Sequence, residues 1–321
     1  MRWLVGRVLQ ALVTAVVALL LFFLIMRLVP GDPVSLLTED RMLTPEQIEM
    51  IRKRYSPDTP LLAQLQSYAA GAMRGDFGTS ILLGRPVRDA IVERLPATLL
   101  LGGTVLLLNF TLGIWLGVRQ AVARGRTEDH VFGTLSLIGY AMPSFWLGLL
   151  LAAMFGIKLQ WFPVGGLSNP LLYDVPWHVR ALDVLHHLVL PTVTLSAVSI
   201  AATMRYQRAA MLEALAEPYV SAARARGLTE RAVRWHHAWR NALFPVLTLF
   251  GLWLPFLVVG AVFVESVFAW PGLGGLTASA ANARDYPLLM GTAVLGTIAV
   301  VTASLLTDVA HAALDPRLRR S

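Results

Sequence analysis

The 321-residue sequence contains no cysteine, and charged residues make up only 15% of it. The absence of cysteine excludes both disulfides and cysteine-ligated metal sites. The low charge content accompanies 56% hydrophobic residues, which lie in long blocks instead of alternating at a helix or strand period. Such blocks are typical of membrane-spanning helices and not of a soluble core.

Lysine is almost as scarce, since Lys53 and Lys158 are the only two. Neither follows a glycine, so the phosphate-binding loop G-x-x-x-x-G-K-[ST] is missing and we expect the chain to bind no nucleotide. The motif H-E-x-x-H is also missing. The adjacent pairs His186–His187 and His236–His237 would point about 100° apart on a helix, which disfavours a shared metal. The sequence therefore predicts no catalytic residue, no cofactor and no metal in this chain.

Six apolar stretches are long enough to cross the roughly 30 Å hydrocarbon core of a bilayer as helices. They run approximately over Leu9–Met26, Ala97–Val118, Thr134–Leu159, His187–Met204, Leu243–Val264 and Leu288–Val309. Pro143 and Pro255 should kink the third and fifth stretches, because proline cannot donate a backbone hydrogen bond. The sequence thus predicts an all-α membrane protein with six transmembrane helices.

Few polar side chains fall inside these stretches. Asn109 is the main one, whereas Glu265 and Asp308 lie near span ends, where we expect solvent or lipid headgroups to reach them. Ion-coupled carriers place ionisable groups or broken-helix carbonyls near mid-membrane, so this scarcity argues against that class, although backbone groups near Pro255 leave it open. The glycine-rich run Pro271–Gly275 is expected to form a turn at the membrane surface.

Arginine positions predict the orientation of the spans, because short loops rich in Lys and Arg stay in the cytoplasm. One side collects Arg2, Arg7, Arg119, Arg124, Arg126, Arg205, Arg208, Arg224, Arg226, Arg231, Arg234, Arg240, Arg317, Arg319 and Arg320. The two short loops opposite contain only Arg180 and Arg284, with Lys158 at an edge. We therefore expect both termini and the connector at residues 205–242 in the cytoplasm. Topology also explains the net charge of +7, so no nucleic-acid partner is expected.

The segment between the first two spans is expected to form a small helical subdomain outside the membrane. Thr44, Pro45 and Gln47 form a capping signal for one helix, and Thr59–Pro60 opens a second. A lid over the spans and a docking surface for a soluble partner are equally open for this segment. We divide the chain into residues 1–96 (first span and extracytoplasmic subdomain), 97–312 (five-helix core) and 313–321 (cytosolic tail).

The connector at residues 205–242 is long, and its helix-forming residues are interrupted by Pro218 and Gly227. Gly227 would end a short helix in the left-handed conformation, which glycine adopts at little steric cost. The small residues Ala222, Ala223 and Ala225 would let another protein surface approach closely. Arg224, Arg226 and Glu230 can form a polar rim around such a contact. From the residues alone, a protein-contact surface and a plain solvated loop fit equally well.

The middle of this connector resembles the EAA motif of ATP-binding cassette importer permeases, in which E-A-A is followed after three residues by Gly. Here it reads SAARARG (221–227), with Ser in place of Glu, as is common in the peptide/nickel branch of that family. The apolar-Pro ending of the motif, RNALFP (240–245), lies farther along the chain than in the general motif. This longer spacing resembles that of dipeptide and oligopeptide permeases. Further motifs in family order are RLVPGDP (27–33), GDFGTS (75–80), ERLPATLLLG (93–102), PSFWLGLLLA (143–152), LPTVTL (190–195), RAAMLEAL (208–215), FVESVFAWPGLG (263–274), RDYP (284–287) and ALDPRLR (313–319).

The resemblance implies the type I ABC importer permease fold, in which the connector forms a coupling helix that docks on a cytosolic ATPase subunit. The expected ATPase-coupling residues are Ser221, Ala222, Ala223, Arg224, Gly227 and Leu228. The residues expected to support the loop are Glu213, Tyr219, Arg240, Asn241 and Pro245. The extracytoplasmic motif comprises Pro30, Gly31, Asp32 and Pro33.

The same resemblance implies the partners: a second homologous permease subunit, two cytosolic ATPase subunits that bind ATP and Mg, and an extracytoplasmic substrate-binding protein. The chain is expected in the lipid bilayer of the bacterial cytoplasmic (inner) membrane, as half of the translocation pathway. Di- or oligopeptides are the expected cargo, with nickel, glutathione and oligosaccharide as alternatives. An ion-coupled secondary transporter and a structural membrane scaffold are the other classes left open.

Overall fold

The computed structural model describes residues 2–28, 44, 46, 61–172 and 174–314. In these residues the regular elements are helices, with one isolated β-bridge between Thr79 and Pro86. The helices are α1 (Arg2–Leu28), α4 (Leu61–Met73), α5 (Val87–Val122), α6 (Thr127–Ala141), α7 (Ser144–Leu151), the π-helical η1 (Ala152–Lys158), α8 (Trp177–Ala216), α9 (Pro218–Ala225), α10 (Glu230–Ala232), the π-helical η2 (Val233–Ala238), α11 (Trp239–Ala242), α12 (Phe244–Trp253), α13 (Phe256–Val259), α14 (Val262–Val267), α15 (Leu273–Asn282) and α16 (Tyr286–Leu314). The prediction of an all-α protein is confirmed.

Five helical stretches of the described chain are long and apolar enough to cross a membrane, and two bent halves form a sixth candidate. The five are Val5–Met26, Val87–Val122, Trp177–Ala216, Phe244–Val267 and Tyr286–Ala312. The sixth consists of α6 followed by α7 and η1, bent by 100° at the break around Pro143. The six predicted spans are therefore present when the bent pair counts as one, but the bend at Pro143 is far sharper than a kink.

The fifth span is also interrupted more strongly than its proline predicts. α12 ends at Trp253, Pro255 precedes α13, and Gly260 with a φ of 80° separates α13 from α14. Pro96 and Pro191, in contrast, lie inside α5 and α8 without ending them. A proline alone removes one backbone donor, whereas the left-handed conformation of Gly260 turns the chain out of the helix. The second break therefore depends on Gly260 and not on Pro255.

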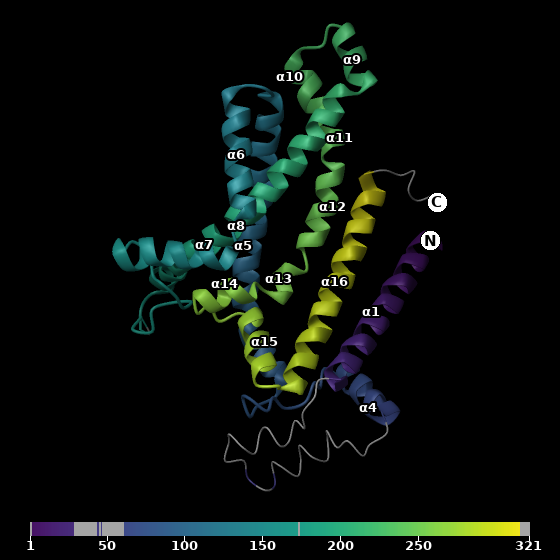
Figure 1. Ribbon diagram of the computed structural model, residues 1–321. Helices are drawn as coiled ribbons and strands as arrows, with labels where there is room; N and C mark the ends of the chain where they lie inside the picture. The colour runs from purple at the N-terminus through teal and green to yellow at the C-terminus, as the bar shows by residue number, and fades with distance from the viewer. Residues whose placement is uncertain (1, 29–43, 45, 47–60, 173, 315–321) are drawn as a thin grey trace.

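The crossing of α5 and α8 forms the centre of the bundle, and glycines let the two backbones approach there (Figure 1). A Cβ atom on Gly113 would lie 2.9 Å from Cβ of Thr203, and one on Gly117 would lie 2.6 Å from the carbonyl oxygen of Met204. Larger side chains at these positions would push the helices apart. The two longest helices are thus held together over a close contact.

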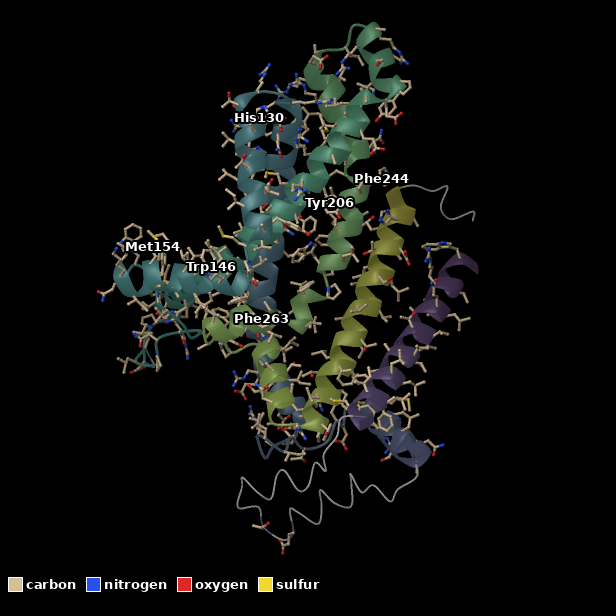
Figure 2. The ribbon with its side chains drawn as sticks, viewed as in Figure 1. His130, Trp146, Met154, Tyr206, Phe244 and Phe263 are labelled. Carbon is tan, nitrogen blue, oxygen red and sulfur yellow. The ribbon has the colours of Figure 1, made fainter. Side chains whose placement is uncertain are left out.

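The outer helices present apolar side chains to their surroundings. α1 runs along α16 (Figure 1), and Arg7 of α1 pairs with Asp308 of α16 at 3.5 Å. Most large apolar side chains of α1 are exposed, as expected for a helix that faces lipid. Figure 2 shows Trp146 and Met154 on the arm formed by α7 and η1, where large apolar side chains also point outward.

The segment predicted to lie outside the membrane is described only in part. α4 confirms the helix that Thr59–Pro60 was expected to open, since it begins at Leu61. Most of the helix predicted from Thr44, and the motif Pro30–Pro33, lie outside the described residues. α5 begins at Val87, so the boundary that we placed at residue 96 falls inside a continuous helix.

Glu265 contradicts the expectation that solvent reaches it, because it is only 1% exposed. Its Oε1 accepts a hydrogen bond from the backbone N–H of Ala261 (3.2 Å), and its Oε2 accepts one from Gly275 (2.8 Å). The run Pro271–Gly275 is not a surface turn as predicted: it leads into α15, and Gly272 packs directly against the Glu265 carboxylate. We refer to residues 255–275 as the break region.

A second buried carboxylate lies at the start of α16. Asp285 accepts hydrogen bonds from the Ser80 hydroxyl (2.5 Å) and from the backbone N–H groups of Leu82 (2.8 Å) and Leu288 (3.1 Å). The bond to Leu288 caps the helix, because it satisfies one of the free N–H groups of the first turn. Asp285 thereby ties the loop before α5 to α16.

Candidate coupling site

Residues 218–242, which we call the tip, lie at one end of the molecule: α9 and α10 extend beyond the end of α8, and η2 and α11 return alongside it (Figure 1). Local sequence explains each element. Pro218 stands in the first turn of α9, where its missing N–H costs nothing. Thr229 caps α10, since its hydroxyl accepts a hydrogen bond from the backbone N–H of Ala232 (3.3 Å). The tip is therefore a set of short helices and not a plain loop.

Gly227 ends α9 in the left-handed conformation, with a φ of 79°, as the sequence predicts. Its N–H donates to the carbonyl of Arg224 (2.9 Å), and the N–H of Leu228 donates to the carbonyl of Ala223 (3.3 Å). These bonds provide donors for carbonyl groups that would otherwise lack a hydrogen-bond partner at the helix end. No heavy atom lies within 4 Å of a Cβ built on Gly227, so its backbone angle, and not crowding, requires glycine.

α9 has an inner and an outer face. The inner face buries Val220 and Ala223 in a cluster with Met211 of α8 and with Val233 and Ala238 of η2. Burial of these side chains fixes the orientation of α9 on α8, because each buried methylene stabilises the packing by about 0.8 kcal/mol. The outer face carries the exposed residues Ser221, Ala222, Arg224, Ala225, Arg226, Gly227 and Leu228.

The structure thus separates the predicted coupling residues into two groups. Ser221, Ala222, Arg224, Gly227 and Leu228 share the outer face and its end. Ala223 is 3% exposed and packs inward. In this chain Ala223 therefore holds the helix in place beneath the outer face.

Charged side chains rim the outer face. Nε of Arg224 lies 2.8 Å from Oε1 of Glu230, and Nε of Arg234 lies 3.8 Å from the other carboxylate oxygen. Both partners of the first pair are about half exposed, so the pair itself adds at most about 1 kcal/mol to stability. Such a pair can exchange its partners with those of another protein at little cost.

Two of the predicted supporting residues are in direct contact. Nδ2 of Asn241 donates a hydrogen bond to the hydroxyl of Tyr219 (2.7 Å) and another to the carbonyl of His237 (3.3 Å). The first bond ties the start of α9 to α11. Pro245 lies in the first turn of α12, and Glu213 and Arg240 occupy exposed positions on α8 and α11.

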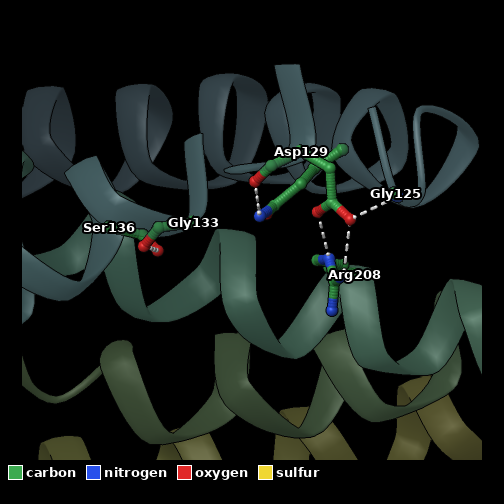
Figure 3. A network of polar contacts seen from close by, with 6 residues as sticks. Gly125, Asp129, Gly133, Ser136 and Arg208 are labelled. Atoms are coloured by element: carbon green, nitrogen blue, oxygen red, sulfur yellow. Dashed lines mark hydrogen bonds and ion pairs between the residues drawn. The ribbon is translucent and has the colours of Figure 1, made fainter. Parts of the chain in front are cut away.

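A further polar contact beneath the tip was missed in the sequence (Figure 3). The guanidinium of Arg208 on α8 donates two hydrogen bonds of 2.9 Å to the two carboxylate oxygens of Asp129 on α6. The same carboxylate accepts from the backbone N–H of Gly125 (3.0 Å), and Gln120 donates to the Asp129 carbonyl (3.1 Å). Asp129 and Arg208 are 79 residues apart in the chain, so no local spacing signals this pair.

This pair connects α8, which carries the tip at its end, to α6. The side chain of Asp129 is only 7% exposed, and paired charges in a planar, two-bond geometry are held more rigidly than single contacts. α8 carries the tip at its end, and Asp129 joins α8 to the turn between α5 and α6. α8 is therefore fixed to α6 and to the turn after α5 by a charged contact near the end that carries the tip.

The chemistry of the site is that of a protein contact. Its outer face offers small side chains, one exposed leucine and guanidinium groups, which suits close approach of another protein surface. Among the described residues, no group of three His, Cys, Asp or Glu side chains lies close enough to hold a metal ion. The outer face thus has the composition expected of a protein-contact surface.

Comparisons with known proteins show the same family along almost the whole chain. Residues 109–320 match the model described as "Binding-protein-dependent transport system inner membrane component", and residues 1–102 match the model of the N-terminal part of such components. The chain is 38% identical to the oligopeptide transport system permease protein AppB of Bacillus subtilis over 300 residues, covering 93% of each chain. It is 37% identical to the di/tripeptide transport system permease protein DppB of Pseudomonas aeruginosa, covering 94% of this chain and 93% of that protein.

A solved structure also resembles the fold. It is described as an inward-facing MetNI methionine ABC transporter, and it aligns with a TM-score of 0.50 at 18% identity over 70% of this chain and 95% of the other. At this identity the likeness concerns the fold alone. The expectation of an ABC importer permease fold is thereby confirmed.

Proposed function

Because the chain belongs to the family of binding-protein-dependent transport system inner membrane components, we propose that it forms half of the translocation pathway of an ATP-driven importer of di- or oligopeptides. The cargo is proposed from the relatives, which are named as oligopeptide and di/tripeptide permeases and match this chain over more than nine-tenths of its length. In this proposal a separate subunit hydrolyses ATP. This chain forms part of the translocation pathway and receives the movement of the ATPase through the tip.

The observation that carries this proposal is the outer face of α9. It leaves Ser221, Ala222 and Leu228 exposed at the end of the molecule, while Val220 and Ala223 fix the helix from below. An exposed helix that is held rigidly from one side is suited to receive a force, because a flexible linker would absorb the movement. We infer that this face sits on a separate ATPase subunit.

The remaining parts follow from the same proposal. ATP and Mg bind to two ATPase subunits on the cytosolic side, which is the side of the tip and of both termini. A second homologous permease completes the pathway, and an extracytoplasmic binding protein delivers the cargo. ATP binding draws the two tips together, and the pair of Asp129 and Arg208 carries the movement into α6, so that rigid helices rock around the path.

Uptake by reconstituted complex tests this function. Proteoliposomes that contain this chain, the second permease and the ATPase subunits would be loaded with ATP and given a radiolabelled dipeptide. We expect uptake only when ATP is present on the ATPase side and the binding protein on the opposite side, with no loss on addition of an uncoupler. Uptake that needs no ATP and collapses with the uncoupler would show an ion-coupled carrier instead.

A further inference from the structure

A cavity of about 370 Å³ lies between three of the candidate membrane spans. One wall is formed by α5 from Thr98 to Leu106, a second by α8 at Leu195 and Val198, and the third by the broken fifth span from Trp253 to Glu265. Ser144 at the start of α7 closes a fourth side. The tip does not contact this cavity, which lies beside the middle of α8, away from the end of α8 that carries the tip.

The third wall is held in its broken form by Glu265. The carboxylate accepts from the N–H of Ala261, just after the break at Gly260, and from that of Gly275 in α15. A Cβ atom on Gly260 would lie 2.5 Å from Oε1 of Glu265, so the carboxylate fits only against glycine. The hydroxyl of Thr98 in α5 accepts from the N–H of Leu273, which fixes α15 to the opposite wall (2.7 Å). The cavity is therefore a built feature and not a packing gap.

Two properties of the walls indicate what fills the cavity. Backbone that leaves the helix at membrane depth is tolerated where it is buried in protein or lines a water-filled space, but not against lipid. Ionisable side chains within membrane spans likewise face the bundle interior or a solvated path. Both features, the break at Gly260 and the carboxylate of Glu265, stand in the same wall. A lipid chain is thus a poor occupant, and a solute on its way through the protein is a suitable one.

We propose that this cavity is a station on the import path that accepts one apolar side chain of the peptide cargo; this assignment rests on the proposed function. The walls are mostly apolar, with Thr98, Ser144 and Glu265 as the polar members, which is the composition of small-molecule sites. The volume lies at the lower end of the range of about 300–1,000 Å³ found for such sites. Phe263 stands at the cavity and is largely exposed (Figure 2), so it marks the entrance.

A cavity-filling variant with a matched control tests the site. V198W places an indole in the cavity from α8, and V193W makes the same change on the same helix at an exposed position that does not line the cavity. In the reconstituted complex, we expect V198W to lower uptake of alanyl-phenylalanine by about tenfold relative to dialanine, because the phenyl ring loses its burial. V193W should leave the ratio of the two uptake rates unchanged.

The outcomes separate this site from the proposed function. If V198W leaves the ratio of alanyl-phenylalanine uptake to dialanine uptake unchanged, the proposed side-chain site is wrong. This holds whether both uptake rates stay normal or fall together, and the cavity would then contain lipid or water. If the wild-type complex imports neither peptide although its ATPase is active, the proposed peptide function fails, and the cargo assigned to the cavity fails with it.

A milder pair of variants covers the case in which the indole prevents assembly. Because the chain has no cysteine, Ser144→Cys introduces the only thiol of this subunit, inside the cavity. Ser266→Cys introduces one on the exposed side of α14, outside the cavity. During turnover, we expect excess alanyl-phenylalanine to slow modification of the thiol at position 144 by a small methanethiosulfonate reagent, and excess dialanine to slow it less. Equal rates with and without peptide at position 144, or equal protection at position 266, would overturn the proposal.

Discussion

The tip and the break region differ in where their charged side chains lie and in what binds them. In the tip, Arg224 and Glu230 pair with each other at the surface, with side chains 42% and 52% exposed. In the break region, Glu265 is 1% exposed, and its carboxylate is bound by backbone N–H groups of Ala261 and Gly275. In the tip, water can replace each partner of the exposed pair. In the break region, the backbone N–H groups cannot leave the Glu265 carboxylate unless the local fold changes.

This difference shows which part can change partners and which part holds its shape. Exposed pairs contribute about 0–1 kcal/mol each, so the tip can break them when another protein arrives. A buried N–H that loses its acceptor costs about 1–3 kcal/mol, so the break region resists rearrangement. The tip is thus suited to transient contact, and the break region to keeping a fixed interruption in a membrane helix.

The largest effect is expected at Glu265. Glu265→Ala leaves the N–H groups of Ala261 and Gly275 bare, which costs roughly 3 kcal/mol in total and lowers the Tm of the purified complex by about 6 °C. Peptide uptake should be lost at the same time, because the cavity wall collapses. Thermal unfolding and vesicle uptake are measured on the same preparation.

The matched control for this change is Glu93→Ala, which removes an exposed carboxylate paired with Arg85. We expect its Tm and its uptake to stay near those of the wild type. If Glu265→Ala unfolds at the wild-type temperature, the carboxylate does not hold the break and the contrast between the two regions disappears.

A change on the outer face of the tip should separate uptake from stability. Ala222→Glu places a charge at the proposed contact with the ATPase, where desolvation costs about 3 kcal/mol and weakens association about a hundredfold. Uptake should be abolished while the Tm of the isolated permease stays unchanged, because position 222 is exposed. Co-purification of the ATPase measures the association.

Ala281→Glu provides the comparison for the tip variant, since Ala281 is an exposed alanine on α15 at the opposite end. This variant should retain the ATPase. Loss of the ATPase from both variants, or from neither, would argue against a specific contact at α9.

The smallest effect is expected at the pair of Asp129 and Arg208, which joins α6 to α8 near the tip. Asp129→Asn removes the charge that Arg208 binds through two hydrogen bonds, which costs about 2 kcal/mol and lowers the Tm by about 4 °C. ATP hydrolysis should continue while uptake per ATP falls, because the movement of the tip is transmitted less completely. Glu128→Gln, at the exposed pair with Arg119 in the same corner, should shift the Tm by less than about 2 °C. Equal shifts in the two variants would contradict the distinction between buried and exposed pairs.

Features that depend on local backbone chemistry could be predicted from the sequence. The apolar stretches gave the spans, because a helix must satisfy its own backbone in lipid. Gly227 was expected in the left-handed conformation and has a φ of 79°. Pro218 and Thr229 likewise start the helices of the tip where their side chains favour a start.

Features that depend on contacts between distant segments could not be predicted. The bend of 100° at Pro143 reflects how α7 packs on α8 and α14, and proline alone sets no angle. Glu265 was expected at solvent because it follows an apolar stretch, yet α15 folds back over it. The inward orientation of Ala223 depends on the position of η2, which no periodicity over a helix of eight residues can fix.

The most direct test of the coupling site is a cross-link from the outer face of α9. The chain has no cysteine, so Ser221→Cys places a unique thiol of this subunit there. In the assembled complex, a short thiol–amine cross-linker should join position 221 to an ATPase subunit, with a yield that changes between the ATP-bound and nucleotide-free complex. Absence of this cross-link in both states, together with labelling of the thiol by an impermeant reagent from outside intact cells, would contradict the account.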